Sequence, residues 1–292
     1  MCMNSCQPEV TTAVPHPFPA PYERCETSLP GGGTFSVAAT NSARVNDPKQ
    51  CCYRFSNRHP PLGRPFRDGD AMRVAARAQR TDWSQPIAPS LAGLTTDARR
   101  ALADAWARDA ASEHASVAAF ARFALQLLAV GAPADLLESA HEAALDEIGH
   151  ARVSYAIASA YAGEAIGPAP LTIASTSIDT SLAAMAVETF LDGCIAETRA
   201  AIVARDKSRV ERDAVVRDVL TTIADDEERH AELAWRTVAW ALRTGGDDVR
   251  NAIAAAAATA FASSSDDDVV REIVRPCIEA ALFEKPPTAS RV

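Results

Sequence analysis

The chain has 292 residues, a net charge of −9 and a pI near 5.2, and 48% of its residues are apolar. This length suits one large domain or two modest ones, with enough apolar residues for a sizeable core. An acidic protein gains nothing from displacing the counterions of nucleic acid, so we expect no nucleic-acid partner. No apolar run approaches about 18 residues, so we expect no membrane span.

The seven cysteines argue against a disulfide framework, because their number is odd and five of them lie in the first 52 residues. The chain has no Cys-x-x-Cys pair, which argues against a zinc ribbon or a rubredoxin-type centre. Residues 1–6 contain no basic stretch followed by an apolar core. We therefore predict no signal peptide and a cytoplasmic location.

Residues 1–95 are predicted to form an irregular N-terminal arm that contains Pro and Cys. Runs such as Pro15–Pro21 and Gly31–Gly33 cannot form a helix or a central strand. The arm also contains the stretch Cys51–Phe55, followed by Gly63–Arg67. We interpret the arm as loosely docked on the protein, and a redox or partner-docking role for these two stretches is the alternative.

Four long helices are predicted from residue 96 onward, and together they form the domain at residues 96–245. Thr96 is the expected N-cap of the first helix, and Asp213 that of the fourth. Gly131-Ala132-Pro133 separates the first two helices. The expected ranges are 96–130, 134–162, 178–209 and 214–243.

Residues 246–292 are predicted to form a C-terminal helical extension, which begins after Gly245-Gly246. Two shorter helices are expected, near residues 248–262 and 267–283. Pro276 should kink the second of them, because proline cannot donate the helical hydrogen bond.

The connector at residues 163–177 determines the expected topology. Its 15 residues can extend over roughly 50 Å, whereas the preceding helix is roughly 43 Å long. The connector can therefore return the chain to the end at which that helix began. One long crossover between two helical hairpins is the ferritin-like arrangement, so we predict an all-α fold with a ferritin-like four-helix bundle.

The motif Glu-x-x-His occurs three times, at Glu147–His150, Glu227–His230 and Glu138–His141. Random placement of 17 Glu and six His would give about 0.35 such matches. Residues three apart share one face of a helix, so each motif can offer an oxygen and a nitrogen to the same ion. The copy at Glu138 lies near the start of its helix and is expected at the surface.

The other two motifs interrupt apolar stripes that should face the interior. In the fourth helix, Glu227 and His230 lie between Ile223 and Ala234 on a stripe with a spacing of three and four. Glu147 and His150 interrupt the second helix in the same way. A buried, unpaired carboxylate is costly, and a metal ion would compensate it.

The first and third helices should supply the remaining ligands. Glu113 is the only acid on the inner stripe of the first helix. In the third helix, one possible stripe places Glu197 inside with Cys194, and a competing stripe places Asp192 inside with Arg199. We prefer Glu197 and keep Asp192 as an alternative or additional ligand.

These residues together form the ligand set of a dinuclear metal site. Four carboxylates offset the charge of two divalent ions, and imidazole suits iron, so we predict two iron ions, with manganese as the alternative. The predicted metal ligands are Glu113, Glu147, His150, Glu197, Glu227 and His230.

Residues 96–243 resemble the ferritin-like superfamily, in its rubrerythrin-like and di-iron oxygenase branches. Two stretches, Glu113–Phe120 and Asp226–Trp235, are similar to those of bacterial ferritin-like domain proteins. The resemblance implies that Glu147 and Glu227 bridge the two ions. Glu113 and Glu197 would then be terminal ligands, with one imidazole on each ion.

The resemblance also implies a function. We expect an oxidoreductase that uses oxygen or peroxide, as an oxygenase, peroxidase or ferroxidase. Because the chain has no rubredoxin-type module, electrons would come from an external donor. The alternatives are an iron oxidation and storage protein, or a non-enzymatic helical scaffold with a structural or vestigial metal site. A homodimer is one assembly that this interpretation allows.

Overall fold

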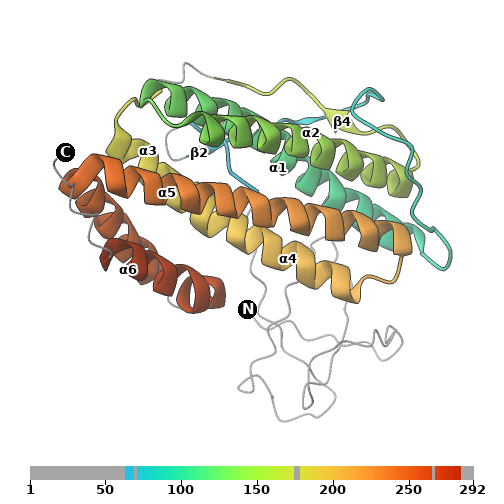
Figure 1. Cartoon of the computed structure of the whole chain (residues 1–292). Helices are drawn as coiled ribbons and strands as arrows, with labels where there is room; N and C mark the ends of the chain where they lie inside the picture. Colours follow the sequence, from blue (N-terminus) through green and yellow to red (C-terminus); the bar gives the residue numbers. More distant parts are fainter. Residues whose placement is uncertain (1–62, 69–70, 174–177, 265–266, 284–292) are drawn as a thin grey trace, which may run out of the picture.

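A computed structural model describes residues 63–68, 71–173, 178–264 and 267–283 of the protein (Figure 1). These residues are mostly helical, as predicted for the all-α class. Their strands are two-residue segments that form two antiparallel pairs, β1 with β2 and β3 with β4. Their bounds are Arg67–Asp68 for β1, Ala71–Met72 for β2, Arg77–Ala78 for β3 and Gly167–Pro168 for β4.

The N-terminal arm is only partly described, and the Cys51–Phe55 stretch lies outside the described residues. The second stretch, Gly63–Arg67, is not loosely docked, because Arg64 and Phe66 are buried in the structure. That part of our interpretation was wrong. This docking could not be predicted, since the arm has no periodic pattern from which burial could be inferred.

The first two helices match their predicted ranges closely. α1 spans Thr96–Ala129 and α2 spans Ala134–Ala162. They lie side by side and run in opposite directions (Figure 1). The N-cap of α1 is Thr95 rather than Thr96. Thr95 has extended backbone angles, and its hydroxyl accepts a hydrogen bond from the Ala98 amide at 3.2 Å, as a cap must.

The third predicted helix begins four residues later than expected and is not uniform. Ser181 caps its first part, α3 (Leu182–Glu188), by accepting a hydrogen bond from the Ala184 amide at 3.1 Å. A π-helical segment, η2 (Thr189–Ile195), follows α3 and leads into α4 (Ala196–Val210). The π-helix was not predicted, because local sequence patterns do not distinguish it from an α-helix.

The fourth helix begins as predicted, because the Asp213 side chain accepts a hydrogen bond from the Val216 amide at 3.0 Å. This helix, α5, spans Ala214–Ser263 and is broken at Gly246, where φ is 59° and ψ is −141°. A positive φ favours glycine, which explains why the expected end falls at Gly245-Gly246. The part after Gly246 corresponds to the predicted helix at 248–262.

The last helical region is irregular just before Pro276, the residue at which a kink was predicted. A π-helical segment, η3 (Val270–Val274), leads directly into α6 (Arg275–Phe283). The second residue of α6 is Pro276, which has no amide hydrogen to donate. The wider turn therefore lies where proline interrupts the regular hydrogen-bond ladder.

α5 is the central element, since it contacts α2, α3, η2, α4 and α6. The connector after α2 runs back along the molecule, so that α2 and the α3–α4 region point in the same direction (Figure 1). Part of this connector is held by β4, which pairs with β3. None of the helices in the described part of the chain combines the length and apolar character needed to cross a membrane.

The core around α1 and α2 divides into two apolar clusters with a polar layer between them. One cluster contains Ala110 and Ala151, and the other contains Phe120 and Ala143. Because α1 and α2 run in opposite directions, the stretch after Ala110 in α1 lies beside the stretch before Ala151 in α2. Both stretches contain the acidic residues that we predicted as ligands.

Leu127 provides a test of this packing, because it is fully buried while its neighbour Leu128 is 60% exposed. We expect Leu127→Ala to lower the free energy of unfolding by about 2–5 kcal/mol, since it removes buried methyl groups and leaves a cavity. Leu128→Ala should change it by less than about 0.5 kcal/mol. Urea denaturation of both variants measures the difference, and equal effects would contradict this placement of α1.

Candidate metal centre

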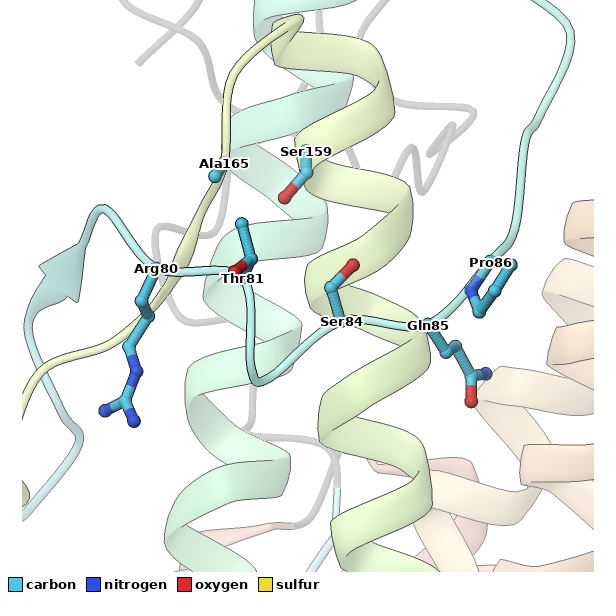
Figure 2. Close-up of a pocket in the computed structure, with 7 residues that line it drawn as sticks. All are labelled: Arg80, Thr81, Ser84, Gln85, Pro86, Ser159 and Ala165. Carbon is cyan, nitrogen blue, oxygen red and sulfur yellow. The ribbon is translucent and has the colours of Figure 1, made fainter.

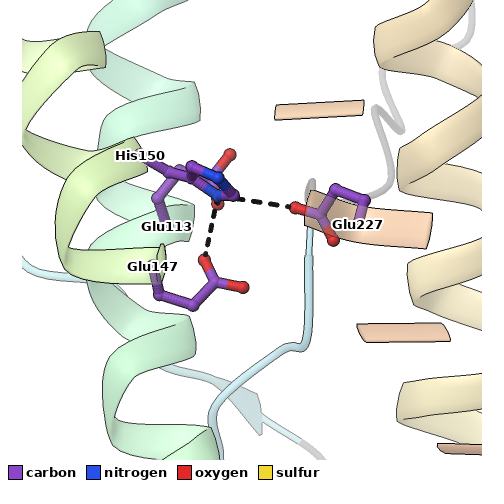
Figure 3. Close-up of side chains that lie close together, drawn as sticks. All are labelled: Glu113, Glu147, His150 and Glu227. Carbon is purple, nitrogen blue, oxygen red and sulfur yellow. Dashed lines mark ion pairs between the residues drawn. The ribbon is translucent and has the colours of Figure 1, made fainter. Parts of the chain in front are cut away.

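The structure brings all six predicted ligands together in the interior. Their side chains form two overlapping groups, in each of which the candidate ligand atoms lie within 4.8 Å of one another. Glu147 and Glu227 belong to both groups. The first group adds Glu113 and His150 (Figure 3), and the second adds Glu197 and His230.

Each group draws its members from helices that are far apart in the sequence. Glu113 comes from α1, Glu147 and His150 from α2, Glu197 from the first turn of α4, and Glu227 and His230 from α5. All six residues are between 0% and 3% exposed. The stripe analysis therefore placed them correctly in the interior of the described chain.

The ligand atoms of the centre lie close to one another. His150 Nδ1 lies 3.8 Å from oxygens of both Glu147 and Glu227, and 3.9 Å from Glu113 Oε2. His230 Nδ1 lies 3.3 Å from Glu147 Oε1 and 3.6 Å from Glu227 Oε2. The centroids of the two imidazole rings are 6.1 Å apart.

The ligand atoms have no hydrogen-bond partners. This holds for both oxygens of each of the four glutamates and for Nδ1 of both histidines. Burying polar atoms without partners is costly, and burying charged ones more so. This donor set fits a metal ion, because carboxylate and imidazole together bind divalent transition-metal ions. The buried groups can thus hold a metal ion.

Two aspartates that we did not predict orient the histidines. His150 Nε2 donates a hydrogen bond to Asp226 Oδ2 at 2.9 Å, and His230 Nε2 donates one to Asp146 Oδ2 at 3.3 Å. Each bond crosses between α2 and α5. With the proton on Nε2, a neutral imidazole leaves the lone pair of Nδ1 free to bind a metal ion.

The two aspartates occupy equivalent positions in the sequence, which could have identified them. Asp146 directly precedes Glu147, and Asp226 directly precedes Glu227, so both motifs have the longer form Asp-Glu-x-x-His. The side chain of Arg229 joins the two aspartates, with distances of 3.0 Å to Asp146 and 2.7 Å to Asp226. The Glu-x-x-His pattern alone does not include the aspartate that precedes it.

Between the two candidates of the third helix, the structure brings Glu197 into the centre and leaves Asp192 outside. Asp192 is buried, but it pairs with Arg67 at 3.3 Å. The π-helix η2 explains why the stripes gave no clear answer. Its wider turn changes the register, so that members of both stripes, such as Thr189 and Cys194, are buried.

The third Glu-x-x-His copy lies at the surface, as expected, since both Glu138 and His141 are exposed. An open pocket lies elsewhere, between the loop at Arg80–Pro86 and α2 (Figure 2). It contains no cluster of carboxylates and histidines, and its Arg80 pairs with Asp82. Among the described residues, the groups of side chains that could hold a metal ion are those of the buried centre.

The protonation of the centre depends on burial and on the crowding of charges. Burial and the nearby charges of Glu147 and Glu227 raise the pKa of Glu113 well above its ordinary value, and burial and Glu227 do the same for Glu197. Burial also opposes ionisation of Glu147, but the two neighbouring histidines hold its pKa well below the ordinary value.

For the two histidines, neighbouring carboxylates affect the pKa more strongly than burial does. Burial would lower the pKa of His150, but its bond to Asp226 and the glutamates around it raise that pKa well above the ordinary value. Asp146 and the glutamates do the same for His230. Without metal, the centre therefore holds protons that metal ions would displace.

Comparisons with protein-family models, with curated proteins and with solved structures gave no match to this chain. The assignment of the centre therefore depends on its residues and their geometry.

The raised pKa values predict how pH acts on chelator-treated protein. Between about pH 5 and 8 the folded state keeps protons on Glu113, Glu197, His150 and His230 that the unfolded state releases, so stability should fall as pH rises. Metal binding requires loss of these protons, so stabilisation by added metal should increase over the same range. Urea midpoints with and without metal measure both trends, and a midpoint independent of pH would contradict them.

Asp226→Asn should weaken metal binding, because it removes the carboxylate that orients His150. We expect the affinity to fall roughly 10- to 100-fold, as measured by competition with a chromogenic chelator. Asp225→Asn is the matched control, because Asp225 is exposed and pairs with Arg205 instead. Equal affinities of the two variants would show that the bond to His150 has no effect on the metal.

Proposed function

We propose that the protein is a di-iron carboxylate protein with a ferritin-like four-helix bundle, and that it acts as an oxidoreductase using oxygen or peroxide. The observation that carries this proposal is the pair of overlapping ligand groups that share Glu147 and Glu227. In the ferritin-like di-iron and di-manganese proteins, two helices each supply a Glu and two each supply a Glu-x-x-His motif. The six residues here have that distribution.

The arrangement of the helices supports the same proposal. α1 and α2 form one antiparallel hairpin, and α4 and α5 form a second, with the long connector between them (Figure 1). One long connection of this kind is found in ferritin-like bundles. The bundle then corresponds to residues 96–245, with the part of α5 beyond Gly246 and α6 as an extension.

The residues of the centre have distinct roles in this proposal. Glu147 and Glu227, which belong to both groups, would help to hold both ions, Glu113 and His150 would hold one of them, and Glu197 and His230 would hold the other. Asp226 and Asp146 hold the two imidazoles in orientation. The ring of Phe120 lies edge-on to His230, with 5.2 Å between centroids, and helps to exclude water. Iron held here would supply the electrons for reduction of oxygen or peroxide.

Loading with ferrous iron tests the proposal. Anaerobic reconstitution of the wild-type protein should give about two iron ions per chain, and exposure to air should consume oxygen and produce a visible absorption band. Glu147→Ala and Glu227→Ala should each lose most of the iron, because each removes a ligand shared by both groups. Metal analysis and an oxygen electrode provide the two measurements.

Glu138→Ala is the matched control for these variants, because Glu138 belongs to the exposed third motif. It should bind iron as the wild-type protein does. Unchanged iron content in both Glu147→Ala and Glu227→Ala would rule out the proposed site. Iron binding without oxygen consumption would instead indicate a structural metal, and uptake of many ions per chain would indicate storage.

A further inference from the structure

A second open pocket, of about 410 Å³, lies between α4, α5 and the π-helical segment η3. Pockets that bind small molecules have volumes of roughly 300–1,000 Å³ and are mostly apolar, with a few polar groups that provide specificity. This pocket has that character. Its apolar lining consists of Ala201, Ile202, Ala231, Trp235 and Ile273.

The pocket and the metal centre use different faces of α5. Glu228, Glu232 and Trp235 all line the pocket, and they are four and three residues apart, so they form one stripe of the helix. Glu228 and Glu232 are exposed, whereas the metal ligands Glu227 and His230 are buried on the inner face. A molecule in the pocket would therefore contact none of the proposed ligands on this helix.

Trp235 gives the pocket a fixed aromatic wall. It is partly buried and packs against the apolar cluster that contains Phe190 and Val274, while it also lines the pocket. Ile273, which is 39% exposed, lines the same pocket from η3. Ala231 is small and buried, so it leaves room between these larger side chains. The pocket can therefore hold a compact apolar group.

Glu232 brings an uncompensated negative charge to this pocket, because it forms no ion pair within the described residues. Arg229 and Arg236, three residues before it and four after it, are its closest potential partners on α5. Both are engaged elsewhere. Arg229 pairs with Asp146 at 3.0 Å, and Arg236 pairs with Asp135 at 2.6 Å.

Glu228 adds a second negative charge, which Arg205 partly offsets at 2.7 Å. None of the residues that line the pocket is a Lys, an Arg or a His. A molecule that enters therefore meets carboxylates beside an indole ring. The face of an indole ring attracts cations, so both features favour a positively charged ligand.

We propose that this pocket binds a small organic cation of the quaternary ammonium class. Such a cation spreads its charge over methyl groups, which pack against an aromatic ring and need no hydrogen bonds. A primary ammonium group has three donors to satisfy, and a largely apolar pocket offers few acceptors. The inference does not depend on the metal ions. It assigns the protein a second binding site, outside the metal centre.

Choline and its neutral analogue, in which carbon replaces the nitrogen, test the charge of the ligand because they have the same shape. Isothermal titration calorimetry of the full chain should show about one choline bound per chain, with the neutral analogue bound roughly 10-fold more weakly. Equal affinity for the two compounds would overturn the proposal, as would the absence of binding at millimolar choline.

Variants test the position of the site. We expect Trp235→Leu to weaken choline binding roughly 10-fold, because it removes the aromatic wall, and Glu232→Gln to weaken it roughly 3-fold, because it removes the charge. Glu142→Gln is the matched control, since Glu142 is exposed on α2 and lies outside the pocket. It should bind choline as the wild-type protein does.

The Glu232→Gln variant decides the outcome where Trp235→Leu does not fold, because an exposed side chain can be changed with little effect on stability. Weaker choline binding in Glu232→Gln than in Glu142→Gln supports the site. Equal binding in these two variants would overturn it.

Discussion

The interior of this protein is organised around the burial of four carboxylates at one place. Charged groups are rarely buried so completely, because each loses its hydration. Here the cost of burying charge is concentrated in one layer between two apolar clusters. The helices around this layer each contribute residues to it. Several features of the structure contact or position the residues of this layer. They include the aspartates that bond the histidines, the glycine (Gly193) that leaves space for the buried Arg64, and the π-helical turn before Glu197.

The parts that sequence could predict are those determined by local periodicity. A stripe with spacing of three and four shows which face of a helix is buried, so Glu113, Glu147 and Glu227 could be placed without knowledge of the partner helices. The helix ends at Pro133, Asp213 and Gly246 were likewise marked by residues with strong local preferences.

The parts that sequence did not predict depend on contacts between distant segments. The bonds from His150 to Asp226 and from His230 to Asp146 join residues of different helices, so no single helix pattern contains them. Arg64 lies in a stretch without periodicity, and its burial depends on Gly193, more than a hundred residues further along the chain. The sequence favoured Glu197 but could not exclude Asp192, because no propensity identifies the π-helix that changes the register just before Glu197.

The way in which the two ligand groups are divided along the chain has a consequence for folding. Each group takes residues from the α1–α2 hairpin and from the half of the chain that follows the long connector. Neither half alone can therefore assemble even one complete site. An ion held by a complete group would therefore bind both halves and oppose their separation. Metal binding would thus stabilise correctly assembled chains. Chains with one misfolded half would not gain this stabilisation.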